Sequence, residues 1–115
     1  MNAVFSVDDI VYINHENKQL EMFMADGNLF PEDITYYRVK LMLNDAFVRV
    51  NKSVIVNLTF ASRIDGTDIV LINDKRFEIM PEYEKNVINE FYKFKFENFV
   101  PDWFFCNIGK SYSYI

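Results

Sequence analysis

The residues best suited to contact a charged partner stand together in the segment Phe47–Leu58. Two apolar runs typical of strands flank the polar tripeptide Asn51-Lys52-Ser53. A loop between strands can carry amide and ammonium side chains into a DNA groove or onto phosphates. Arg49 interrupts the first apolar run and adds a second cation beside this break. The plainer interpretation, an ordinary solvent-exposed turn, fits the same residues.

The rest of the sequence offers little for catalysis or metal binding. One Cys and one His exclude a disulfide framework and any metal site built from several such ligands. The three glycines are too far apart for a phosphate-binding loop. Cys106 follows aromatic residues, and a lone cysteine in such surroundings is usually an unreactive, packed thiol. His15 falls in an expected turn, where a solvated histidine is more common than a ligand or a base. We therefore expect no enzyme, no cofactor and no bound metal.

Composition predicts one folded domain with an uneven charge distribution. The chain has 115 residues, of which 50% are hydrophobic, and its formal net charge is −5. Residues 36–76 hold seven basic and four acidic residues, whereas both flanks are acidic. Overall acidity argues against a nucleic-acid partner and the basic middle favours one, although ordinary surface scatter also explains a small excess. The sequence shows no signal peptide and no apolar run of membrane-spanning length, so we expect a cytoplasmic protein that does not enter the membrane.

Apolar periodicity predicts a mainly β, β-rich α+β domain of antiparallel strands with short helices. Strands are expected at 10–13, 20–24, 28–30, 47–50, 54–58 (continued through 59–64), 68–72 and 75–80, with turns at 15–18, 26–27, 65–66 and 73–74. A short helix is expected between 31 and 45, with Asp33 as its N-cap. Residues 82–96 predict a second, C-terminal helix with Pro81 in its first turn.

An aromatic C-terminal extension follows this helix. Residues 97–115 are rich in Phe, Tyr and Trp without a clear period, whereas residues 1–96 form the domain. So many aromatic side chains call for burial. We expect the extension to pack back on its own domain, with a partner or dimer surface as the alternative.

The segment 47–58 resembles the core motif of the LytTR family of bacterial DNA-binding domains, Phe-Val-Arg-Val-(His/Asn)-(Arg/Lys)-Ser-x-Ile-Val-Asn-Leu. The surrounding segments that match the family in order are 9–13, 20–24, 26–27, 34–43, 60–66 and 69–79. The resemblance covers about residues 8–92. It implies an elongated, mostly antiparallel β fold that inserts loops, rather than a recognition helix, into successive DNA grooves.

The resemblance also implies roles for individual residues. Asn51 and Lys52 match the loop that reads bases and phosphates, and Arg49 matches an arginine that supports this loop or reaches the DNA backbone. The turn at 15–18 matches the first contacting loop, which makes His15 and Asn17 candidate DNA-binding residues.

One departure from the family lies in the third contacting loop. Where the family carries Ser-Arg-Arg-Tyr, this chain reads Met80-Pro81-Glu82-Tyr83. A carboxylate facing a phosphate is repulsive, and each lost cation removes one released counterion. Lys85, from the next turn of the helix, is expected to compensate in part.

These features predict a small, stand-alone bacterial transcriptional regulator that binds double-stranded DNA through inter-strand loops. A homodimer would suit it, because paired domains double the phosphate contacts. The alternative is a LytTR-like protein-interaction module that has lost DNA affinity. Such a module would modulate a partner regulator through its aromatic extension.

Overall fold

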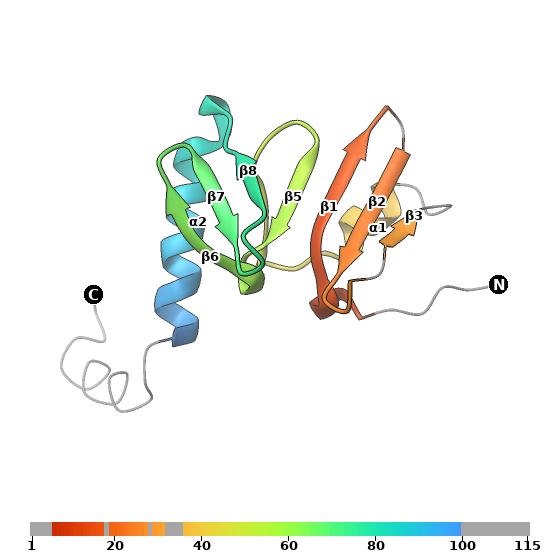
Figure 1. Cartoon of the computed structure of the whole chain (residues 1–115), viewed down its shortest axis with the longest axis horizontal. Coiled ribbons are helices and arrows are strands. Elements are labelled where there is room, and N and C mark those ends of the chain that lie inside the picture. The colour runs from red at the N-terminus through yellow and green to blue at the C-terminus, as the bar shows by residue number, and fades with distance from the viewer. Residues whose placement is uncertain (1–5, 18, 28, 32–35, 100–115) are drawn as a thin grey trace.

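The computed structural model describes residues 6–17, 19–27, 29–31 and 36–99. The elements in chain order are η1 (Val7–Asp9), β1 (Ile10–Glu16), β2 (Gln19–Met24), β3 (Leu29–Pro31), α1 (Tyr36–Met42), β4 (Phe47–Arg49), β5 (Val54–Asn57), η2 (Leu58–Phe60), β6 (Ala61–Asp65), β7 (Asp68–Leu71), β8 (Arg76–Glu78) and α2 (Pro81–Phe99). The strands form two antiparallel sheets, a five-stranded one in the order β3-β2-β1-β5-β4 and a three-stranded one in the order β6-β7-β8 (Figure 1). The expected β-rich fold class with a C-terminal helix is confirmed.

The five-stranded sheet is buried on both faces, and β5 shows why its sequence is continuously apolar. Val54 and Val56 contribute to one hydrophobic core, whereas Ile55 between them contributes to the other. Alternate residues of a strand point to opposite faces, so a strand covered on both sides has no position for a solvated side chain. All four residues of β5 are buried.

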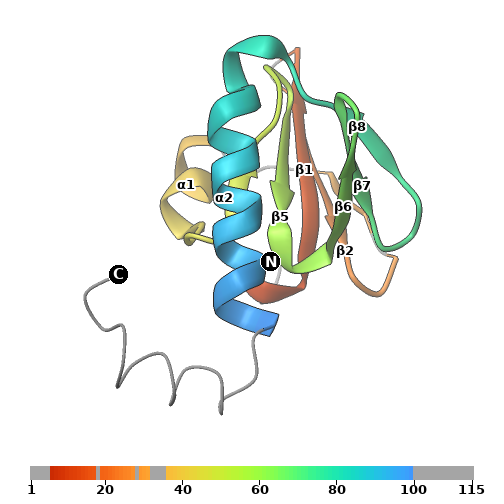
Figure 2. The same cartoon turned by 90° about the vertical axis from the view of Figure 1, so that its left-hand side faces the viewer.

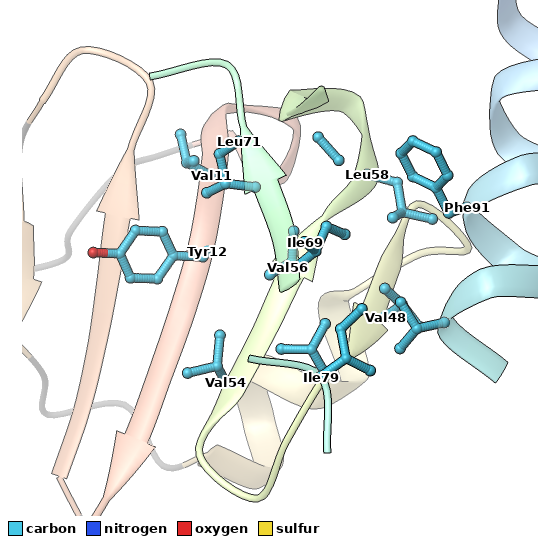
Figure 3. Packing of buried hydrophobic residues seen from close by; sticks show 13 residues of the cluster. Val11, Tyr12, Val48, Val54, Val56, Leu58, Ile69, Leu71, Ile79 and Phe91 are labelled. Carbon is cyan, nitrogen blue, oxygen red and sulfur yellow. The ribbon is translucent and has the colours of Figure 1, made fainter. Parts of the chain in front are cut away.

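The larger core joins the two sheets and α2 (Figure 3). Its buried members are Val11, Tyr12, Val48, Val50, Val54, Val56, Leu58, Ala61, Ile69, Leu71, Ile79, Val87 and Phe91. The smaller core lies on the other face of the five-stranded sheet, where Val39 of α1 covers β1, β2 and β5. Its buried members are Ile10, Ile13, Leu20, Met22, Met24, Val39 and Ile55.

Helix α2 packs beside β4, the edge strand of the larger sheet. Figure 2 shows that the helix axis runs nearly parallel to the line of β1 and β5. Val87 and Phe91 are four residues apart, so they lie on one face of the helix, and both are buried in the larger core. Lys95, one turn further on, donates a hydrogen bond to the Ala61 carbonyl and lies 5.3 Å from the centre of the Phe91 ring. Partial burial lowers the pKa of Lys95.

Several boundaries differ from those that the sequence predicts. Strand β1 continues to Glu16, so His15 lies in the strand opposite Leu20 and not in a turn. The turn between β1 and β2 is short, because Glu16 pairs directly with Gln19, and His15 therefore remains in the strand. Asn17 takes the left-handed conformation (φ 53°) that Asn tolerates better than most residues.

The predicted continuation of a strand through 59–64 is also wrong in part. The 3₁₀ turn η2 redirects the chain after β5, and β6 then joins the other sheet. The last strand is shorter than predicted, and α2 begins at Pro81 and ends at Phe99. The proposed cap Asp33 and the extension beyond residue 99 lie outside the described residues.

Asn57, which is 1% exposed, joins β5 to the start of β1. Its Nδ2 donates to the Ile10 carbonyl at 2.8 Å, and its Oδ1 accepts from the Thr59 amide at 2.9 Å, which caps η2. A buried amide is stable only when such partners are present, because an unpaired polar group in the core is costly.

We predict that Asn57→Ala destabilises the fold by about 1–3 kcal/mol, because two backbone groups lose their partner in or near the core. Urea unfolding of the full chain measures this. Asn44→Ala is the matched control, since the Asn44 Oδ1 makes a comparable bond to the Ala46 amide on the exposed surface. Equal unfolding midpoints for the two variants would contradict the assignment.

Candidate nucleic-acid interface

Three chain segments meet at one end of the larger sheet, which we call the loop end. It comprises the β1–β2 connection at Glu16–Asn17, the β4–β5 loop Val50–Ser53 and the β8–α2 junction Glu78–Glu82. Figure 1 shows the β1–β2 turn, the β4–β5 loop and the first turn of α2 at its top. These are the segments that the sequence predicts as contacting loops.

Backbone hydrogen bonds hold the three segments to one another. The His15 amide donates to the Ser53 carbonyl at 2.7 Å, which ties the end of β1 to the β4–β5 loop. The Met80 amide donates to the Val50 carbonyl at 3.0 Å, which ties the same loop to the start of α2. The β4–β5 loop is therefore the central segment of the loop end.

The side chain of Asn51 is hydrogen-bonded to backbone groups of the loop end. Its Oδ1 accepts from the amides of Ser53 and Val54 at 2.9 and 3.0 Å, and its Nδ2 donates to the Glu78 carbonyl at 3.1 Å. The side chain of Arg49 also bonds the backbone of the β4–β5 loop. Its Nη1 donates to the carbonyls of Asn51 at 3.3 Å and Lys52 at 2.9 Å.

The other predicted contact residues differ in exposure. Lys52 and Asn17 are exposed at two neighbouring turns of the loop end. His15 is partly buried, and its side chain lies on the same face of β1 as that of Ile13, which belongs to the smaller core. Lys85 is exposed on α2, one helical turn beyond Pro81. Of these residues, Lys52 and Asn17 best meet the requirements for contact with a partner at the loop end.

The β8–α2 junction explains the unusual Pro81 and Glu82. Pro81 is the first helical residue, where its fixed φ suits the helix and its missing N–H costs little. Glu82 is exposed in the first turn, where a carboxylate is favourable beside the positive end of the helix dipole. Tyr83, which the sequence shares with the family pattern, packs against the larger core. The departure thus stabilises the start of α2 and places a negative charge at the loop end.

Two of the basic residues of the middle third, Lys75 and Arg76, lie at the β7–β8 turn and not at the loop end. Arg76 donates to Asp65 at 2.7 Å and to Asp68 at 3.2 Å, and this hydrogen bond lowers the pKa of Asp65. Lys75 follows the β7–β8 turn and lies 5.5 Å from the centre of the Phe77 ring. The positive charges that are close along the sequence are therefore divided between the loop end and the β7–β8 turn.

No motif or spacing along the chain points to Asn14, which precedes the β1–β2 turn. Within the described residues, its Oδ1 is buried without a hydrogen-bond partner. A polar hollow of about 120 Å³ is lined by Asn14, Glu16, Asn17, Gln19 and Glu21. Only the pairing of β1 with β2 brings these residues together, which is why spacing along the chain does not reveal the hollow.

Across the described parts of the chain, no three or more His, Cys, Asp or Glu side chains are grouped so that they could hold a metal ion. None of the helices in these parts has the length and apolar character needed to cross a membrane.

Comparison with known proteins identifies the family. The family model for the LytTr DNA-binding domain matches residues 2–89. A solved LytTr DNA-binding domain from Bacillus cereus has the same fold, with a TM-score of 0.63 and 15% sequence identity. The similarity covers 75% of this chain and 84% of that one. No curated protein matches the chain. Because the family model spans most of the sequence, this chain belongs to the LytTR family, a family of DNA-binding domains rather than of enzymes.

Proposed function

We propose that this protein binds double-stranded DNA through its loop end and acts as a bacterial transcriptional regulator. Membership of the LytTR family supports a DNA partner. The observation that carries the choice of surface is the bonding of three loop segments at one end of the sheet. A DNA partner in turn implies a protein of the cytoplasm.

The loop end presents side chains that suit two kinds of DNA group, the backbone phosphates and the base edges. The Lys52 ammonium, carried on an exposed loop, suits a phosphate or a base edge. The amide of Asn17, at a turn with a left-handed backbone, suits a base edge or a phosphate of the neighbouring groove. Lys85 supplies a further phosphate contact from α2.

The second candidate function is a protein-interaction module that modulates a partner regulator. Glu82 at the loop end disfavours phosphate, and two aromatic side chains on α2 are exposed over half of their surface or more. Tyr92 is 58% exposed and Phe96 is 50% exposed, and their spacing of four residues places them on one helix face. An exposed aromatic pair of this kind suits a protein partner or a second copy of the chain.

Selection of bound fragments from a genomic DNA library distinguishes the two candidates. The purified full chain would be used at about 50 mM and about 200 mM salt, a range over which phosphate contacts weaken strongly. An enriched motif supports the regulator, and a repeat spaced by about one helical turn indicates two bound copies. A folded protein that enriches nothing at either salt concentration contradicts DNA binding and favours the protein-interaction module.

We predict that Lys52→Ala weakens DNA binding and makes its salt dependence shallower. The negative slope of log K against log[salt] should decrease in magnitude by about 0.9, the value for one lost phosphate contact. Lys75→Ala is the matched control, because it removes the same charge from the β7–β8 turn, away from the loop end. Fluorescence anisotropy titrations at several salt concentrations measure both slopes. If the two variants behave alike, Lys52 does not contact DNA.

We predict that Glu82→Arg strengthens DNA binding and steepens the salt slope, because a repulsive carboxylate becomes a cation at the loop end. Glu84→Arg is the control, since both glutamates lie in the first turn of α2 and the change in net charge is the same. The two residues project from nearly opposite sides of the helix, because two positions along a helix correspond to a rotation of about 200°. An equal gain from both variants would show that net charge alone, and not a contact near Glu82, determines the affinity.

A further inference from the structure

We propose that Asn51 is a positioning residue that fixes the β4–β5 loop against the β8–α2 junction, and that it does not read a base. This inference rests on the proposed DNA-binding function. It assigns Asn51 a different role from the one that its place in the family motif implies.

The hydrogen-bonding capacity of the Asn51 amide carries the inference. An Asn that reads adenine uses both ends of its amide, with the oxygen accepting and the nitrogen donating. The carbonyl oxygen of an amide has two lone pairs. Both are taken here, by the amides of Ser53 and Val54, and Nδ2 donates to the Glu78 carbonyl. Reading a base would therefore require Asn51 to give up bonds within the loop.

The backbone carbonyls of the loop are also hydrogen-bonded. Each of its four successive carbonyls accepts a hydrogen bond. The Val50 carbonyl accepts from the Met80 amide, those of Asn51 and Lys52 from Arg49, and that of Ser53 from the His15 amide. The loop is thus held on three sides by β1, β4 and the β8–α2 junction. Among the side chains of its tripeptide, that of Lys52 is the exposed one.

This arrangement gives the loop end a preformed shape. A flexible loop must lose conformational entropy when it binds, whereas a loop already held by its own hydrogen bonds loses little. Asn51 also spans 27 residues of sequence to reach Glu78, so it sets the spacing between two predicted contacting segments. Removing its side chain should therefore change geometry rather than charge.

Amide hydrogen exchange of the free full-length protein tests the positioning role without DNA. We expect Asn51→Ala to speed exchange at Ser53, Val54 and Met80 by about threefold to tenfold, since each amide loses a bond or the support of the junction. Asn73→Ala is the matched control, because the Asn73 Oδ1 bonds the Lys75 amide in the same i to i+2 manner at a different turn. Unchanged exchange at all three amides would overturn the proposal.

A second variant separates the two halves of the Asn51 side chain. Asn51→Asp keeps both acceptor bonds but cannot donate to the Glu78 carbonyl. We expect the amides of Ser53 and Val54 to stay protected while that of Met80 exchanges faster. Equal protection of Met80 in Asn51→Asp and the unaltered protein would show that the bond to Glu78 does not hold the junction, and would overturn the proposal.

The DNA arm of the experiment uses the motif enriched from the genomic library. For Asn51→Ala we expect weaker binding with an unchanged salt slope, and no loss of preference at any single base pair. Loss of preference confined to one base pair would show that Asn51 reads that base. If the unaltered protein binds no DNA, the proposed function fails, while the exchange measurements still decide whether Asn51 positions the loop.

Discussion

The fixed placement of β5 is the constraint on which the rest of the structure depends. This strand lies between β1 and β4, and its neighbouring residues enter different hydrophobic cores. A shift of one residue in register would exchange the two faces, so the cores themselves determine the register. An asparagine lies near each end: Asn57 closes one end against β1, and Asn51 closes the other against the β8–α2 junction.

This constraint connects the fold to the proposed function. Because the β5 register is fixed, the loop that precedes it is also fixed, and the loop carries Lys52 to the surface beside the β1–β2 turn. The solved LytTr domain shares this fold at only 15% identity. A core that keeps its hydrophobic pattern and volume tolerates extensive substitution, so two chains can share a fold at such a low identity. Glu82 is a departure from the family pattern at the surface, since it suits the start of α2 and yet adds a negative charge to the loop end.

Much of the fold could be predicted from the sequence, because it depends on local patterns. The apolar run at Val54–Val56, the Asp65-Gly66 turn and the helix after Pro81 each have a short-range signal. The environment of the site residues could not be predicted in this way. The partner of the Asn51 amide lies 27 residues away, and the acidic partners of Arg76 become its neighbours only when β6, β7 and β8 pair. The local sequence places His15 in a turn, because nothing near it in the chain shows that Glu16 pairs with Gln19.

The most direct test of DNA binding at the loop end is residue-specific. Amide chemical shifts of the isotope-labelled full chain would be followed while a double-stranded fragment enriched from the genomic library is added. The proposed function predicts that the largest changes fall in the β1–β2 connection, the β4–β5 loop and the first turn of α2. Changes that instead cluster around Tyr92 and Phe96, with the loop end unaffected, would contradict it.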